Sequence, residues 1–235
     1  VTLPEEPPLP LRAALSLPIP PVTKLRAELT QPAPGAMPWR EFIRQRSHSV
    51  HFPQITQDDT AFILYTSGTS GKPKGAPLTH GNIVSVLKAG MEWLEDWGAV
   101  REKVLGVLPM FHIYGLALNY ALPLSIGAEM VLVPAPKPKL YQAAITKTRP
   151  TVLPGVPTLY DKIIEWAVES NADLSSIHTS ISGASTLPVE TIERWENATG
   201  GRLIEGYGLT ETAPILAGNP LDGTRRPGYI CLLYT

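Results

Sequence analysis

The fold of this chain is decided by the stretch Tyr65-Thr66-Ser67-Gly68-Thr69-Ser70-Gly71-Lys72-Pro73-Lys74-Gly75. The apolar run directly before it, residues 61–64, predicts a buried strand. Glycines allow successive backbone N–H groups to turn toward one anion, while hydroxyls add donors and lysines add positive charge. A strand that opens into such a loop is therefore expected to bind phosphate groups.

The ordinary P-loop does not account for this stretch. That motif requires a glycine, four further residues, and then Gly-Lys followed by Ser or Thr. Here Thr66 stands where the first glycine belongs, and Pro73 follows Lys72 where a hydroxyl should hold magnesium. A flexible linker is the other reading, but linkers rarely combine paired lysines with a preceding apolar strand. We therefore expect a phosphate loop of another kind.

Behind the loop, helical and strand patterns alternate along the chain. This alternation predicts an α/β fold, with a parallel-rich sheet flanked by helices on both faces in the doubly wound manner. The first predicted helix, residues 79–97, carries Ile83, Leu87, Met91 and Leu94 on one face. The other predicted strands are residues 104–108, 129–133, 151–153, 177–181 and 202–204, the last of the series, and the other helices are 116–126, 138–148, 157–169 and 188–199.

Ligands of such sheets bind at the carboxyl ends of the strands. The phosphate loop and the segments 109–115, 182–185 and 207–211 each directly follow a predicted strand. We therefore expect these strand ends to meet at one cleft.

At this point the residues carry a resemblance to a family. The phosphate loop, Leu108-Pro109-Met110-Phe111-His112-Ile113-Tyr114-Gly115, Ser182-Gly183-Ala184-Ser185 and Glu205-Gly206-Tyr207-Gly208-Leu209-Thr210-Glu211-Thr212 occur in this order. Together they resemble the motifs of the AMP-forming acyl-CoA synthetases, which are fatty-acid–CoA ligases of the adenylate-forming superfamily. The chain is similar to a fragment of their N-terminal adenylation domain.

The resemblance implies a reaction. ATP would activate a long- or medium-chain fatty acid to an acyl-adenylate, which then becomes an acyl-CoA thioester with release of AMP and pyrophosphate. ATP, Mg²⁺ and coenzyme A as second substrate are the implied cofactors. Two alternatives stay open: a non-catalytic module that binds nucleotide or acyl-adenylate, and an adenylating enzyme that loads a carrier protein.

The same resemblance assigns roles to residues. Thr210 would bond the α-phosphate, Glu211 would bind Mg²⁺ as the metal ligand, and Tyr207 would stack on adenine. The implied catalytic set is Thr66, Lys72, His112, Thr210 and Glu211. The implied nucleotide-binding set is Thr66, Ser67, Gly68, Thr69, Ser70, Gly71, Lys72, Lys74, Gly183, Ala184, Ser185, Glu205, Gly206, Tyr207, Gly208 and Thr210, and the implied acyl-binding set is His112, Tyr114, Gly115, Val156 and Gly206, with Pro157 and Leu159 lining the same pocket.

The loop at residues 109–112 indicates which class of carboxylic acid would be the substrate. Amino-acid-activating relatives place an aspartate in the loop that corresponds to residues 109–112, whereas this chain has no Asp between Asp96 and Asp161. The loop and the residues after it are apolar and aromatic, which favours a fatty or aryl acid. The sequence leaves the chain length open.

Composition excludes several other classes. A formal net charge of -1 gives no indication of nucleic-acid binding. Cys231 is the only cysteine, so no internal disulfide can form. No apolar run reaches the roughly 18 residues of a membrane span, although peripheral membrane contact is compatible with the sequence. We expect a cytoplasmic protein that acts on small molecules, of an oligomeric state that the sequence does not indicate.

The two ends of the chain differ from the middle. Residues 1–40 hold ten of the 25 prolines and predict an extended arm, followed by a short helix at residues 39–43. The expected organisation is an arm over residues 1–50, a nucleotide- and acyl-binding core over 51–230, and a tail of non-native origin over 231–235. The family's C-terminal domain, with its catalytic lysine, has no counterpart in the sequence, so we expect this chain alone to be truncated and catalytically weak.

Overall fold

A computed structural model describes residues 52–68, 71–93 and 101–230, with isolated positions before them. The chain divides into two compact units, residues 1–54 and 55–235, and the elements below belong to the second. The proline-rich arm, the 39–43 helix, Leu94, Thr69, Ser70 and the 231–235 tail lie outside the described residues, apart from those isolated positions.

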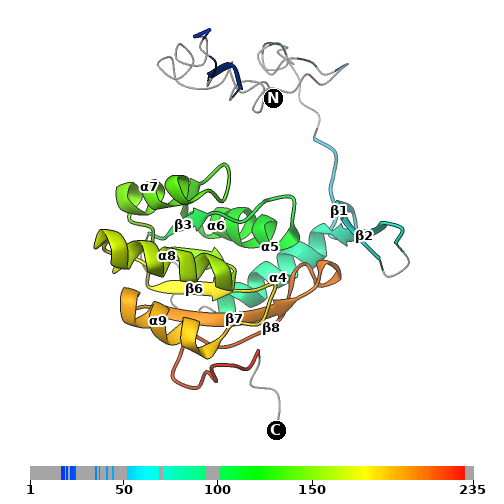
Figure 1. The fold of residues 1–235 in the computed structure, drawn as a ribbon. Coiled ribbons are helices and arrows are strands. Elements are labelled where there is room, and N and C mark those ends of the chain that lie inside the picture. Colours follow the sequence, from blue (N-terminus) through cyan, green and yellow to red (C-terminus); the bar gives the residue numbers. More distant parts are fainter. Residues whose placement is uncertain are drawn as a thin grey trace. The chain divides into compact units, whose positions relative to one another are not determined.

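Strands and helices alternate through the second unit (Figure 1). The elements are β1 (Thr60–Thr66), β2 (Lys74–Thr79), α4 (His80–Trp93), β3 (Lys103–Gly106), α5 (Ile113–Leu116), the π-helical turn η2 (Ala117–Ala121), α6 (Leu122–Ile126), β4 (Glu129–Leu132), α7 (Pro138–Thr148), β5 (Val152–Gly155), α8 (Pro157–Ser170), β6 (Thr179–Ser182), α9 (Val189–Thr199), β7 (Arg202–Gly208), the 3₁₀ turn η3 (Thr210–Thr212) and β8 (Ile215–Gly218).

The central sheet has the order β4-β3-β5-β6-β7-β8. The pairs from β4 to β7 are parallel, and β8 pairs antiparallel with β7. Helices cover both faces of the sheet. Neighbouring residues of one strand point to opposite faces and therefore pack against different helices. Leu203 of β7 belongs to the core formed with α7, α8 and α9, whereas Ile204 packs with α4, η2 and α6. The predicted α/β class is confirmed.

Several helices end where the sequence places their stop signals. Helix α7 covers the predicted residues 138–148, and Gly200 closes α9 in the left-handed conformation with φ 72°. Helix α8 begins with Pro157 at its first turn, a position where the missing N–H costs nothing. These elements follow from local signals alone.

The structure corrects the predicted first strand. β1 is the first arm of a two-stranded antiparallel hairpin with β2, outside the central sheet. Leu64 packs inward, but Ile63 is 58% and Tyr65 is 74% exposed. The apolar run is therefore half-exposed instead of buried, because a hairpin has only one face to place against the rest of the unit.

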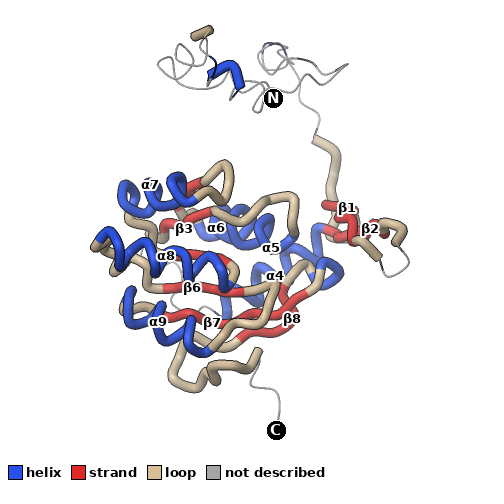
Figure 2. The backbone as a smooth tube through the Cα atoms, viewed as in Figure 1, coloured by secondary structure: helices blue, strands red, loops and turns tan. Residues whose placement is uncertain are grey.

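Two further elements differ from the sequence reading. β7 is not the last strand, since β8 runs beside it at the end of the sheet (Figure 2). The predicted helix at 116–126 starts earlier, at Ile113, and passes through the π-helical turn η2 before it stops at Gly127. Among the described residues, no helix is long and apolar enough to cross a bilayer.

Candidate functional site

The phosphate loop forms the turn of the β1–β2 hairpin. Gly68 and Gly71 both have positive φ, 62° and 75°, and the Gly71 N–H approaches the Gly68 carbonyl at 3.4 Å. A Cβ on Gly68 would lie 2.6 Å from the Lys72 carbonyl oxygen, so only glycine fits there. The tight turn keeps Lys72 and Lys74 exposed at its C-terminal side.

His112 begins the helical segment that follows β3. Its Nδ1 accepts a hydrogen bond of 3.2 Å from the Tyr114 N–H, which makes it the N-cap of α5. Nδ1 of His112 therefore has a structural role as the cap of α5, while the side chain also lines the large cavity described below. Gly115 is required by packing, because a Cβ there would lie 2.3 Å from the Pro109 carbonyl oxygen.

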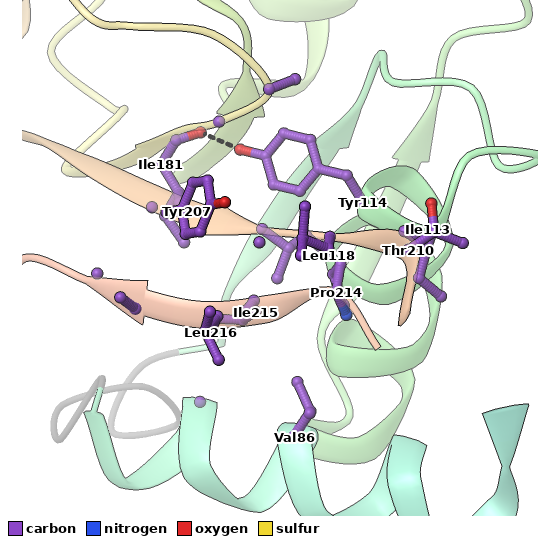
Figure 3. Close-up of a pocket in the computed structure, with 18 of the residues that line it drawn as sticks. Val86, Ile113, Tyr114, Leu118, Ile181, Tyr207, Thr210, Pro214, Ile215 and Leu216 are labelled. Atoms are coloured by element: carbon purple, nitrogen blue, oxygen red, sulfur yellow. Dashed lines mark hydrogen bonds between the residues drawn. The ribbon is translucent and has the colours of Figure 1, made fainter. Parts of the chain in front are cut away.

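Tyr114 connects this segment to the end of β6. Its hydroxyl donates to the carbonyl oxygen of Ile181 at 2.6 Å (Figure 3). It also lies 3.2 Å from the carbonyl oxygen of Gly155, which accepts from the same hydroxyl. Burial raises the pKa of the hydroxyl well above its usual value, so the hydroxyl stays protonated and remains a donor to these carbonyl oxygens. The ring packs against Gly183, where a Cβ would lie 3.1 Å from it. Tyr114 thus lines the cavity, while its hydroxyl is already bound to backbone carbonyl oxygens.

A buried carboxylate stabilises the loop that follows β6, residues 183–187. Glu205 is 5% exposed, and its Oε1 accepts a 3.1 Å hydrogen bond from the N–H of Leu187, itself buried. Ala184 adopts φ 70°, a left-handed conformation that costs a non-glycine residue energy. Glu205 thereby fixes the course of the loop that carries Gly183 and Ala184.

The segment after β7 makes a tight return into β8. Gly208 lies against Pro214, whose carbonyl oxygen would be 1.5 Å from a Cβ. The Thr212 hydroxyl accepts from the Leu209 N–H at 2.9 Å and donates to the Pro214 carbonyl at 2.9 Å. These contacts fix the backbone around Tyr207, Thr210 and Glu211.

These segments surround a cavity of about 640 Å³ (Figure 3). Val86 points from α4 toward the strands β7 and β8, and Tyr207 is 42% exposed on the opposite side. The predicted site residues that line the cavity are Thr66, His112, Tyr114, Gly183, Ala184, Glu205, Gly206, Tyr207, Gly208, Thr210 and Glu211.

A second hollow of about 330 Å³ adjoins the first. Thr66 and Glu211 line both spaces, and Lys74 lines only the second. The hairpin therefore brings a hydroxyl and a cation beside the carboxylate of Glu211, although β1 lies outside the central sheet. The expectation that the strand ends meet at one cleft holds for the segments after β3, β6 and β7, while the phosphate loop arrives from the hairpin.

Other predicted site residues lie elsewhere. Ser67, Gly68, Gly71, Lys72, Gly115 and Ser185 line neither space. Val156 was expected in the acyl pocket, but it packs against the core of α7, α8 and α9 on the other face of the sheet. Pro157 and Leu159 are likewise buried at the start of α8. None of these three residues lines the large cavity or the second hollow, and their place in the acyl pocket stays a prediction.

The sequence reading missed the wall that α4 contributes. Val86, Ala89, Gly90 and Trp93 line the cavity. Val86, Gly90 and Trp93 are spaced by four and three residues, which places them on one helix face beside the core-facing stripe of Leu87 and Met91. Helical periodicity could have revealed this second face.

Comparison with known proteins agrees with this geometry. A family model described as AMP-binding enzyme matches residues 11–231. A long-chain-fatty-acid–CoA ligase of Bacillus subtilis is 40% identical over 190 residues, which cover 80% of this chain and 34% of that protein. A mitochondrial malonate–CoA ligase of Xenopus laevis is 38% identical over 189 residues, covering 74% of this chain and 32% of that protein.

Solved structures give the same result. The crystal structure of apo MatB from Rhodopseudomonas palustris superposes with a TM-score of 0.70 at 30% identity, over 82% of this chain and 37% of that one. The chain spans about a third of the length of the curated relatives that it matches. Because the family model matches residues 11–231 and curated acid–CoA ligases are 38–40% identical over most of the chain, the chain belongs to the AMP-binding enzymes, a family that includes acyl-CoA ligases.

Proposed function

We propose that this chain holds the nucleotide and the acid for an AMP-forming acid–CoA ligase that activates an apolar monocarboxylic acid of the fatty type. The observation that carries the proposal is that one cavity is lined by Tyr207 and Ala184 and also by Val86, Ala89 and Trp93 of α4. Thr66 and Glu211 lie where this cavity meets the second hollow. Adenine, α-phosphate and acyl group would thus occupy one continuous space.

The chemistry requires two anions to approach each other. A carboxylate oxygen forms a bond to the α-phosphorus of ATP, the bond from that phosphorus to the β-phosphate oxygen breaks, and pyrophosphate leaves. No proton is removed from the carboxylate, so no general base is needed. The site must instead align the groups and stabilise negative charge. Thr66, Thr210 and Lys74 are the donors that the proposal assigns to this task.

Magnesium fits the residues present. Mg²⁺ in phosphate sites usually takes one or two protein carboxylates and completes its shell with phosphate oxygens and water. Glu211 supplies one carboxylate at the boundary of the two hollows. Among the described residues no three His, Cys, Asp or Glu side chains gather into a metal cage, so the substrate phosphates would supply further ligands. The ion would neutralise the phosphate charge.

The cavity lining favours an apolar acid over a dicarboxylate. Relatives include both fatty-acid and malonate ligases. Within residues 52–68, 71–93 and 101–230, no lysine or arginine lines the large cavity, whereas Val86, Trp93, Leu118, Leu122 and Ile215 do. A second carboxylate buried there would lose its hydration without a charge partner, at a cost of several kcal/mol. The acyl end is therefore proposed to take alkyl or aryl groups, with coenzyme A as acceptor in the whole protein.

Titration calorimetry with non-hydrolysable acyl-sulfamoyl adenosines tests the proposal. We expect octanoyl and longer mimics to bind the 235-residue chain, and the malonyl and alanyl mimics to bind at least tenfold more weakly. Tyr207→Ala should weaken binding roughly tenfold or more through lost stacking on adenine. Tyr120→Ala, which removes another tyrosine with the same 42% exposure, should leave it unchanged. Tighter binding of the malonyl mimic would reject the fatty-acid assignment, and a folded chain that binds no mimic would reject the function.

A further inference from the structure

Asn219 is a buried polar residue that the proposed function does not use. It is 3% exposed and directly follows β8. Its backbone N–H donates to the Glu205 carbonyl at 3.0 Å, and its side-chain Oδ1 accepts from the Arg226 N–H at 3.1 Å. Its Nδ2 donates to the carbonyl oxygens of Arg226 and Tyr229. Asn219 therefore joins the edge of the sheet to the turn formed by residues 226–229.

The same residue holds an aromatic side chain of the cavity wall. The indole Nε1 of Trp93 donates to the Asn219 carbonyl oxygen at 3.0 Å. Trp93 ends α4, lines the cavity, and is 49% exposed. One surface of the indole thus faces the cavity while another faces solvent. The hydrogen bond fixes the end of α4 against the end of β8.

Small residues keep this end of the cavity open up to the indole. A Cβ on Gly90 would meet nothing within 4 Å. Gly206 and Gly218 pair across β7 and β8, and a Cβ on either would find its nearest atom at 3.8 or 3.7 Å. The indole Nε1 lies 4.0 Å from the position of a Cβ on Gly218. The glycines at positions 90, 206 and 218 therefore place no side chain into the space between α4 and the strand pair beside Trp93.

We propose that Asn219 and Trp93 form a latch that closes the α4 end of the cavity and sets the longest acyl chain that it accepts. This inference rests on the proposed function, since it names what limits the acyl group at the same site. Trp93 is the specificity-determining residue, and Asn219 is a positioning residue that acts through the indole.

The length limit has a physical reason: methylenes of the acyl chain gain affinity while they are buried in the cavity, and they lose it once the chain collides with the indole of Trp93. Each methylene buried in an apolar space strengthens binding by about 0.8 kcal/mol, which is roughly fourfold. This gain stops where the chain meets a wall that cannot move. The hydrogen bond from the Trp93 indole to the Asn219 carbonyl oxygen holds such a wall in place, because rotation away from the strands would break that bond at a cost of about 1 kcal/mol. The acyl length at which affinity stops rising therefore reports the position of Trp93.

The test is a chain-length profile measured by calorimetry. Saturated acyl-sulfamoyl adenosines from two to sixteen carbons, in two-carbon steps, are titrated into the chain and its variants. For the unmodified chain we expect the dissociation constant to fall with each step and then to rise beyond one length. Trp93→Ala should move that length upward by at least one step, and Gly90→Leu should move it downward.

Two further variants distinguish the effect of the Trp93–Asn219 hydrogen bond from the effect of side-chain size at position 93. Trp93→Phe keeps an aromatic ring but loses the donor, and should blur the limit so that the next longer chain binds within threefold of the best. Asn219→Ala keeps the backbone carbonyl that accepts from Trp93 but removes the side-chain hydrogen bonds to Arg226 and Tyr229 that hold this backbone, and it should loosen the limit in the same direction. Trp166→Ala is the control, because Trp166 packs against the core on the other face of the sheet, and it should lower stability without moving the limit.

The outcomes distinguish the latch from the function beneath it. If mimics bind but the limit stays the same in Trp93→Ala and Gly90→Leu, the latch is wrong and the proposed function stands. If Trp93→Phe keeps a sharp limit, the hydrogen bond to Asn219 has no role in length selection and the latch is wrong. If the folded chain binds no mimic of any length, the proposed function and the latch both fail.

Discussion

At the scale of single residues, the site depends on close contacts that admit one residue type. Gly208 touches the Pro214 carbonyl so closely that no side chain fits, and Gly183 lies under the ring of Tyr114. These glycines were identified from the sequence as parts of binding motifs. The structure shows that packing also demands them, because each allows another group to approach its backbone.

The Gly208 contact gives a prediction. Gly208→Ala places a Cβ 1.5 Å from the Pro214 carbonyl oxygen, so the return into β8 must move. We expect the free energy of unfolding to fall by about 2 kcal/mol or more, with loss of adenylate-mimic binding as Tyr207 and Glu211 shift. Urea denaturation followed by circular dichroism measures the first quantity. Gly223→Ala, where a Cβ meets nothing within 4 Å, is the matched control and should behave like the unmodified chain.

Glu205 gives a second prediction at this scale. Glu205→Ala leaves the buried N–H of Leu187 without its 3.1 Å acceptor, which should cost roughly 1–3 kcal/mol of stability. The loop with Gly183 and Ala184 should loosen, and mimics should bind more weakly. Glu205→Gln retains an acceptor oxygen and should recover most of both losses. Equal damage from the Ala and Gln variants would show that the hydrogen bond to Leu187 is not what matters.

At the scale of elements, the helices are joined by hydrogen bonds at their ends as well as by the core. Arg149 caps α7 in a left-handed conformation with φ 48°, and its Nη1 lies 2.7 Å from Oδ2 of Asp173, which follows α8. Asp173 also accepts from the Ser175 N–H at 2.8 Å.

On the cavity side, the π-helical turn places Asn119 inward, where its Nδ2 donates to the Leu108 carbonyl at 3.0 Å and supports the His112 loop.

The Asp173 contacts predict a pH dependence of stability. Hydrogen bonds from Ser175 and the guanidinium of Arg149 hold the pKa of the Asp173 carboxyl well below its usual range. A carboxyl whose pKa is lowered by folding contributes stability above its unfolded pKa, near 3.9, and loses it as the pH falls toward the folded value. The unmodified chain should therefore be more stable than Asp173→Asn at pH 6, and the difference should shrink below about pH 4. A difference that stays constant over this range, in urea melts at each pH, would contradict the assignment.

At the scale of the whole molecule, the cavity is assembled from segments far apart in the chain. The hairpin supplies Thr66 and Lys74, α4 supplies one wall, and the ends of β3, β6 and β7 supply the remaining motifs. Two core clusters hold these segments in place from opposite faces of the sheet. The parallel strands of the core thus act as a rigid support, while the specificity of the site is proposed to come from α4 and β8 at its edge.

The sequence by itself determined the elements and motifs whose signals are local. The start of α7 at Pro138 follows from its proline and the end of α9 from Gly200, and the binding motifs follow from residue types at fixed spacing. Only the tertiary structure decided that residues 61–64 form a half-exposed hairpin, that Val156 faces the other side of the sheet, and that Trp93 reaches Asn219 across 126 positions. The reason is physical: a local pattern fixes periodicity and backbone conformation, whereas the face an element buries depends on partners that are distant in sequence.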